Sequence, residues 1–252
     1  MKAIILCAGK GERLRTLTET IPKPMILINN KPILEYLILL CRKHEIKDIA
    51  INTSYLPEKI KQHFGNGKKF GVNLHYSFEP ELLGTSGALN NFKNFFNETF
   101  FVIYGDNITS LDLTEMLRYH KSKKASATLY LYREKIMDEK TTLGCVVISN
   151  DNIIKEIIEN PDESEKEQLK KMLFERKLTN AGVYILEPEI LKLIPEGYSD
   201  FAKDIFPRAL EKGCKLYGFQ SDCYFKEIGQ MQRYLMAKKD IESGKIKFDF
   251  LN

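Results

Sequence analysis

The sequence predicts an α/β protein whose central β-sheet is mixed but mostly parallel. In the first half, short apolar runs alternate with longer segments of helical character, an order typical of a parallel, doubly wound sheet. In the second half, extended segments follow one another with only short links, which indicates an antiparallel or mixed region. Together these patterns favour one layered α/β unit.

The elements of the first half follow from apolar runs and helix-start signals. Strands are expected at residues 2–7, 48–53, 72–76 and 100–104. Helices are expected at residues 32–44, 57–64 and over most of 84–95. The first two begin at a proline, which suits the first turn of a helix.

The second half reads as a group of strands closed by helices. Strands are expected at residues 127–132, 145–148, 153–158 and 182–186, and helices at 201–212 and 230–243. The charged segment Glu163–Lys177 carries Leu169, Met172 and Leu173 at helical spacing. It predicts a surface helix with one buried stripe, and a lid or a subunit contact is the alternative.

Composition excludes several classes of function. The 252 residues, 43% hydrophobic and 29% charged, suit one large soluble domain. A net charge of +4, from 38 basic and 34 acidic side chains of interspersed sign, is too small to indicate a nucleic-acid-binding protein. Because there is no membrane-length apolar run and no leader, we expect a cytoplasmic protein without membrane contact. Five cysteines without a Cys-x-x-Cys pair indicate buried thiols in a reducing compartment.

The loop after the first strand is the most informative stretch. Gly9 and Gly11 let backbone N–H groups approach a phosphate chain, and Arg13 and Lys23 add two cations. A dinucleotide fingerprint is excluded because Leu14 stands where its third glycine is required, and a Walker loop because Gly-Lys-Ser/Thr is absent. A tight turn is the alternative for a lone Gly-x-Gly.

Gly9-Lys-Gly-Glu-Arg-Leu14, followed by Pro22-Lys-Pro24, resembles the G-x-G-x-R-L…P-K-P motif of the sugar-1-phosphate nucleotidylyltransferases. The resemblance runs from Met1 to about Leu235, and within the family it is to the mannose-1-phosphate and heptose-1-phosphate guanylyltransferases. It implies a Rossmann-like (GT-A-like) three-layer sandwich. It also implies Mg²⁺ as cofactor and a nucleoside triphosphate and a hexose or heptose 1-phosphate as substrates, with an NDP-sugar and pyrophosphate as products.

The resemblance and the lack of a linker predict a single domain over residues 1–252. Its parts are a nucleotide-binding half (1–125), a sugar-phosphate-binding half (126–229) and a C-terminal helix and tail (230–252). We expect no C-terminal β-helix of the kind found in some relatives. The sequence leaves the oligomeric state open, a homo-oligomer included.

Nucleotidyl transfer joins two anions, so its site needs cations and a metal more than a strong base. Asp106 directly follows the apolar strand 100–104, a position suited to holding Mg²⁺, and the family carries its metal aspartate there. Glu227, in a segment resembling the family's late Asp-x-Gly motif, is the second expected metal ligand, although Asp is usual there. Arg13 is expected to hold the β- and γ-phosphates, and Lys23 to lie between the α-phosphate and the acceptor phosphate. The expected catalytic set is Arg13, Lys23 and Asp106.

Glu79 lies five residues before the glycine of Leu83-Gly84-Thr85, where the family places its base-contacting side chain. Uridylyl and thymidylyl enzymes commonly have Gln there, whereas a carboxylate only accepts hydrogen bonds and matches the two adjacent donors of guanine. The sequence therefore favours GTP, and a solvated glutamate is the alternative. The expected nucleotide-binding residues are Leu6, Ala8, Gly9, Lys10, Gly11, Glu79, Gly84 and Thr85.

Acceptor contacts are expected mainly in the second half. Glu159 precedes Asn160 where the family has Glu-Lys, so the usual lysine is missing and Lys226 is a candidate replacement. The expected sugar-phosphate-binding residues are Asn107, Gly144, Glu159, Asn180 and Lys226. The rival functions are a uridylyl- or thymidylyltransferase on another sugar phosphate and a non-catalytic paralogue that binds an NDP-sugar.

Overall fold

The computed structural model describes residues 1–133, 145–159 and 178–251. A seven-stranded sheet runs through it in the order β12-β8-β11-β6-β1-β4-β5. Its strands are β1 (Lys2–Leu6), β4 (Asp48–Thr53), β5 (Asn73–Phe78), β6 (Phe100–Tyr104), β8 (Ala127–Tyr132), β11 (Thr179–Leu186) and β12 (Leu216–Gln220). Only β11 runs antiparallel to its neighbours, β6 and β8, so the expected mixed, mostly parallel sheet is confirmed.

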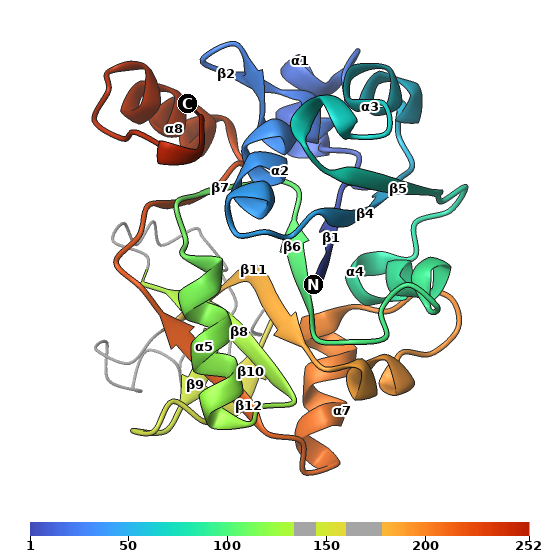
Figure 1. Ribbon diagram of the computed structural model, residues 1–252, viewed down its shortest axis with the longest axis vertical. Helices are drawn as coiled ribbons and strands as arrows, with labels where there is room; N and C mark the ends of the chain where they lie inside the picture. The colour runs from blue at the N-terminus through green and yellow to red at the C-terminus, as the bar shows by residue number, and fades with distance from the viewer. Residues whose placement is uncertain (134–144, 160–177, 252) are drawn as a thin grey trace.

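Helices cover both faces of the sheet (Figure 1). One apolar core joins the sheet to α2 (Ile33–Lys43), α3 (Pro57–Phe64), α5 (Leu113–Lys123) and α8 (Met231–Glu242). A second core lies under α7 (Phe206–Glu211) and the 3₁₀ turn Ala88–Phe92, which directly follows α4 (Gly84–Gly87). Along β1, Ala3 and Ile5 belong to the first core and Ile4 to the second, as the alternation of a strand requires. The three-layer arrangement is therefore confirmed.

Some elements differ from the expected ones. The helix expected over 84–95 is only α4 and the 3₁₀ turn, and the one expected over 201–212 begins as a π-helical segment, Phe201–Ile205. The strands at 145–148 and 153–158 form a separate antiparallel ribbon, β9 (Cys145–Ile148) with β10 (Ile154–Ile158). The α-helices and strands that the sequence did not predict are α1 (Arg15–Thr18), β2 (Leu27–Ile28), β3 (Lys31–Pro32), β7 (Asn107–Thr109), α5, β12 and β13 (Phe225–Glu227).

The expected helix in Glu163–Lys177, and the positions Gly144 and Asn160, lie outside the described residues. Within the described ranges, no helix has both the length and the apolar character needed to cross a membrane.

The parallel strands place the functional segments together. The carboxyl ends of β6, β1, β4 and β5 meet at one edge of the sheet, in that spatial order. The glycine loop follows β1, Asp106 follows β6, Asn52 lies near the end of β4 and Glu79 follows β5. Ligands of open α/β sheets bind at this edge.

Candidate active site

A cleft of about 560 Å³ opens at the carboxyl edge of the sheet. Every predicted nucleotide-binding and catalytic residue lines it, namely Leu6, Ala8, Gly9, Lys10, Gly11, Arg13, Lys23, Glu79, Gly84, Thr85 and Asp106. Segments that lie far apart in the sequence therefore contribute to one concave surface, as a substrate site requires.

The glycine loop forms the wall of the cleft next to β1. Gly11 has a left-handed backbone (φ +66°), and its carbonyl accepts hydrogen bonds from Leu14 N–H (2.9 Å) and Thr18 Oγ1 (3.0 Å). A β-carbon at Gly11 would lie 3.0 Å from Lys23 Cβ. Glycine is therefore required both for the backbone conformation and for the close approach of Lys23.

Backbone contacts on both sides fix Asp106 at the end of β6. Gly105 N–H donates to Leu6 O (2.9 Å), which joins the ends of β6 and β1. Ile228 N–H donates to Asp106 O (2.7 Å) and ties β13 to the same turn. These bonds bring Glu227, the other predicted metal ligand, to the same side of the sheet as Asp106.

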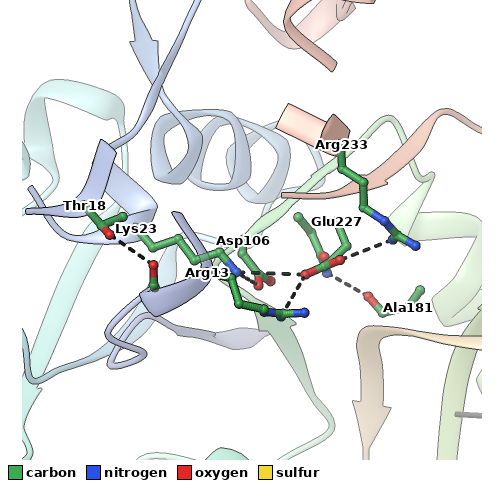
Figure 2. A network of polar contacts seen from close by, with 9 residues as sticks. Arg13, Thr18, Lys23, Asp106, Ala181, Glu227 and Arg233 are labelled. Atoms are coloured by element: carbon green, nitrogen blue, oxygen red, sulfur yellow. Dashed lines mark hydrogen bonds and ion pairs between the residues drawn. The ribbon is translucent and has the colours of Figure 1, made fainter. Parts of the chain in front are cut away.

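Charged side chains meet around these two carboxylates (Figure 2). Lys23 Nζ donates to Asp106 Oδ2 and lies 4.0 Å from Glu227 Oε1. Arg13 Nη2 lies 3.7 Å from Glu227 Oε1, and Arg233 Nη1 donates to Glu227 Oε2 (3.2 Å). Burial, and then the charge of Asp106, raise the pKa of Glu227, while Lys23, Arg233 and Arg13 oppose that rise. The arrangement is an anionic pair held by three cations.

The two carboxylates fit a metal that is shared with a phosphate ligand. Asp106 Oδ1 is buried, and no group in the described ranges donates a hydrogen bond to it. In the same ranges, no group of three or more His, Cys, Asp or Glu side chains could hold a metal. Mg²⁺ commonly binds one or two carboxylates and completes its shell with water and substrate phosphates. The free oxygen of Asp106 is suited to that role.

Glu79 lies at the opposite end of the cleft, and its side chain is almost completely buried (1% exposed). Its Oε1 accepts a hydrogen bond from Asn52 Nδ2 (2.8 Å) and its Oε2 accepts one from Leu83 N–H (3.1 Å). Asn52 was not predicted as a site residue. A polar side chain near the carboxyl end of a parallel strand is the sequence signal that could have found it.

The structure does not bring all the predicted acceptor residues to the cleft. Asn107 is buried, and its Nδ2 donates to Ala181 O (2.7 Å), so its side chain serves the packing of β7 against β11. Lys226 and Glu227 line a second groove, of about 1080 Å³, bounded by β8, β13 and α8.

Glu159 and Asn180 lie beyond the cleft, on the side of the second core. Burial, and then the charge of Asp200, raise the pKa of Glu159. Asn180 Nδ2 donates to Tyr184 Oη (2.8 Å), and Tyr184 Oη donates to Tyr104 Oη (3.2 Å). Tyr104 and Asp200 themselves line the cleft. Asn180 is therefore linked to the cleft through Tyr184 and Tyr104, and Glu159 interacts with it through the charge of Asp200.

A loop that precedes α7 also reaches the cleft, and no motif in the sequence pointed to it. Ser199 N–H donates to Leu83 O (3.0 Å), and Thr85 Oγ1 donates to Asp200 Oδ2 (2.8 Å). These bonds fix Tyr198 and Asp200 beside the turn that carries Gly84 and Thr85. Their sequence separation of more than 100 residues explains why local patterns do not reveal them.

Comparison with known proteins agrees with this geometry. Residues 2–244 match the family described as nucleotidyl transferase. A UTP--glucose-1-phosphate uridylyltransferase of Synechocystis sp. is 36% identical over 260 residues, covering 98% of this chain and 65% of the relative, so the chain spans just under two thirds of that protein. A D-glycero-alpha-D-manno-heptose 1-phosphate guanylyltransferase of Aneurinibacillus thermoaerophilus is 36% identical over 246 residues, covering 96% of this chain and 99% of the relative.

A solved structure extends the comparison to the fold. A putative glucose-1-phosphate thymidylyltransferase from Bacillus anthracis superposes with a TM-score of 0.82 at 25% identity, covering 98% of this chain and 97% of the other. The expected family is thus confirmed by sequence and by fold. The chain belongs to the nucleotidyl transferase family, among the sugar-1-phosphate nucleotidylyltransferases.

Proposed function

We propose that this protein transfers a nucleotidyl group from GTP to a hexose or heptose 1-phosphate such as mannose 1-phosphate, giving a GDP-sugar and pyrophosphate. The observation that carries the proposal is the meeting of Arg13, Lys23 and Asp106, from separate segments, on one cleft beside a glycine loop. That is the set of groups that a reaction between two anions needs.

The order of groups across the sheet suits an in-line transfer. Glu79 marks the base end above β4 and β5, and the glycine loop with Asp106 marks the phosphate end above β1 and β6. The acceptor would then approach from the side of β11, where Tyr104 and Asp200 line the cleft. An oxygen of the acceptor phosphate attacks the α-phosphorus while the bond between the α-phosphorus and the bridging oxygen breaks, and pyrophosphate leaves.

Lys23 and Arg13 have distinct parts in this scheme. Lys23, 12% exposed and already paired with Asp106, turns toward the α-phosphate and the acceptor phosphate and reduces their repulsion. Arg13, 65% exposed at the mouth of the cleft, holds the β- and γ-phosphates and the departing pyrophosphate. Mg²⁺, when bound, would neutralise triphosphate charge, with Asp106 and Glu227 as its protein ligands.

The choice of GTP rests on Glu79. A carboxylate accepts hydrogen bonds only, and guanine presents N1–H and the N2 amino group side by side. The two relatives that are each 36% identical carry different names, one a uridylyl- and the other a guanylyltransferase, so identity does not separate the bases. Transfer from UTP or dTTP is the alternative.

The acceptor residues remain part of the proposal. Glu159 and Asn180 would read sugar hydroxyls together with Gly144, and Lys226 would replace the cation missing at Asn160. One N–H of the Asn107 amide is already used by Ala181 O, and the side chain is buried, so a structural role competes with the sugar-phosphate role expected for it.

A crossed panel tests the function. GTP, UTP, dTTP, ATP and CTP would each be incubated with Mg²⁺ and several sugar 1-phosphates, and the products scored by mass. A GDP-sugar as the main product supports the proposal, and a UDP- or dTDP-sugar as the main product would replace the base assignment. Binding of nucleotide sugar without any product would favour the non-catalytic paralogue.

A further inference from the structure

A relay of hydrogen bonds joins the ends of three neighbouring strands beneath the base end of the cleft. Cys7 N–H donates to Asn52 Oδ1 (2.8 Å), and Asn52 Nδ2 donates to Glu79 Oε1 (2.8 Å). Leu83 N–H donates to Glu79 Oε2 (3.1 Å). Asn52 and Glu79 are 2% and 1% exposed, so these bonds are shielded from water.

We infer that Asn52 is a positioning residue for base selection. Its amide N–H donates to the side chain at position 79, so that this side chain can present only hydrogen-bond acceptors to the nucleotide base. The inference deepens the proposed preference for GTP and rests on it. According to this inference, Asn52 and Glu79 together, rather than Glu79 by itself, determine which nucleotide base the protein prefers.

The direction of each bond in the relay is fixed by backbone groups. Cys7 N–H can only donate, so the oxygen of the Asn52 amide must face it and the nitrogen must face Glu79. Leu83 N–H can also only donate. Position 79 therefore lies between two fixed donors, and both terminal atoms of its side chain must accept. The amide N–H₂ of a glutamine at position 79 would face one of these two N–H donors in either orientation of the amide, and two donors cannot form a hydrogen bond with each other.

The remaining capacity of Glu79 matches guanine. A carboxylate has about four acceptor sites, and the relay uses two of them. A buried carboxylate needs further donors, and among the described residues no cation forms an ion pair with it. Guanine N1–H and N2–H would supply two more donors. Uracil would bring one N–H with carbonyl oxygens beside it, and those oxygens would oppose the carboxylate.

The relay can be reversed by two substitutions. Asn52→Asp keeps an acceptor for Cys7 N–H but replaces the donor that faces Glu79 with a second carboxylate. Combined with Glu79→Gln, the new amide at position 79 can donate to the carboxylate at position 52 and accept from Leu83 N–H. That amide would then present one N–H and one lone pair to the base, the pattern that complements the N3–H and carbonyl of uracil or thymine.

The test measures kcat/KM for GTP and UTP in the wild type, N52D, E79Q and the double variant N52D/E79Q. Asn97→Asp, an exposed site away from the cleft, is the matched control and should match the wild type. We expect N52D to lower the ratio of kcat/KM for GTP to kcat/KM for UTP about 10- to 100-fold, which corresponds to the loss of one charge-assisted hydrogen bond. E79Q should be poor with both nucleotides, and the double variant should gain UTP activity at least about tenfold over E79Q.

The outcomes separate the inference from the proposed function. If the wild-type protein prefers UTP, the proposed use of GTP as the nucleotidyl donor is wrong. A wild type that prefers GTP, with an unchanged ratio in N52D or no gain in the double variant, would overturn the role of Asn52 alone. If N52D fails to fold, the double variant decides, because it carries the complete relay with its middle bond reversed.

Discussion

Lys23 and Asp106 form an ion pair inside the cleft although 83 residues separate them in the sequence. The pair joins the segment after the glycine loop to the end of β6, and both side chains are mostly buried, at 12% and 21% exposure. In the proposed reaction this pair must open, because a phosphate competes for Lys23 and a metal for Asp106. The pair thus places side by side the two charges that the proposed reaction uses.

Asp106→Asn should lower turnover by about 100- to 1,000-fold or more, because it removes the charge that would hold Mg²⁺ while keeping the shape of the side chain. The concentration of Mg²⁺ that gives half-maximal rate should rise as well. Pyrophosphate release measured against Mg²⁺ concentration checks both effects. Asp151→Asn, at an exposed turn, is the control, and equal Mg²⁺ dependence in the two variants would refute the metal role.

Gly11→Ala should damage activity more than stability. A left-handed backbone (φ +66°) strains alanine by about 1–3 kcal/mol, and the new β-carbon would lie 3.0 Å from Lys23 Cβ. Gly213→Ala is the matched control, because Gly213 also has a positive φ (+74°) but no atom within 4 Å of its ideal β-carbon. Denaturant unfolding should show comparable losses for both variants, and only Gly11→Ala should reduce kcat. Equal kcat values would contradict this placement of Lys23.

Asn107→Ala should destabilise the fold by about 1–3 kcal/mol, because it leaves the buried carbonyl of Ala181 without its donor. KM for the sugar phosphate should change little, since the amide is occupied by this structural contact. Urea unfolding and steady-state kinetics separate the two roles. A large rise in that KM with unchanged stability would instead support the sugar-phosphate role expected from the sequence.

His120 should make stability depend on pH. Burial lowers its pKa from the ordinary 6.5, although hydrogen bonding to Glu187 opposes this shift. The unfolded chain therefore takes up a proton at a higher pH than the folded chain. The stabilisation is present above pH 6.5 and is lost as pH falls from there toward the folded pKa. His120→Gln should flatten the loss of unfolding free energy between about pH 7 and 5, and an unchanged slope would show that His120 is not responsible.

The first half of the fold was predictable because its signals are local. A central strand is predicted by the five apolar residues of β6, Phe100–Tyr104, and a buried helix by the mostly apolar sequence of α2. Neither prediction needs tertiary information. β12 was not predicted because Leu216–Gln220 is interrupted by a glycine, and its pairing with β8 decides its conformation. In the segment expected to be mostly helical over 84–95, the N–H groups of Ser86 and Gly87 donate to Ser199 O, and the α-helix gives way to a 3₁₀ turn after Gly87.

The site was predictable to the extent that its residues follow strand ends. Arg13, Lys23, Glu79 and Asp106 line one cleft, as their motif spacing predicted, because each segment lies beside the carboxyl edge of the sheet. Asp200 reaches the cleft through a hydrogen bond from Thr85, across 115 residues, and no pattern in the sequence records such a contact. The acceptor residues stay a prediction; for Asn180, the register shift of β11 after this residue is a tertiary feature that no local pattern records.

The most direct test of the account is a double-mutant cycle on Lys23 and Asp106. Pyrophosphate release would be measured for Lys23→Ala, Asp106→Asn and the double variant, with Lys93→Ala as an exposed control. Because both side chains act on one triphosphate, each single variant should lose several orders of magnitude in turnover, and the double variant should fall within about tenfold of the worse single. Near-normal turnover in either single variant, or losses that multiply in the double variant, would contradict the account.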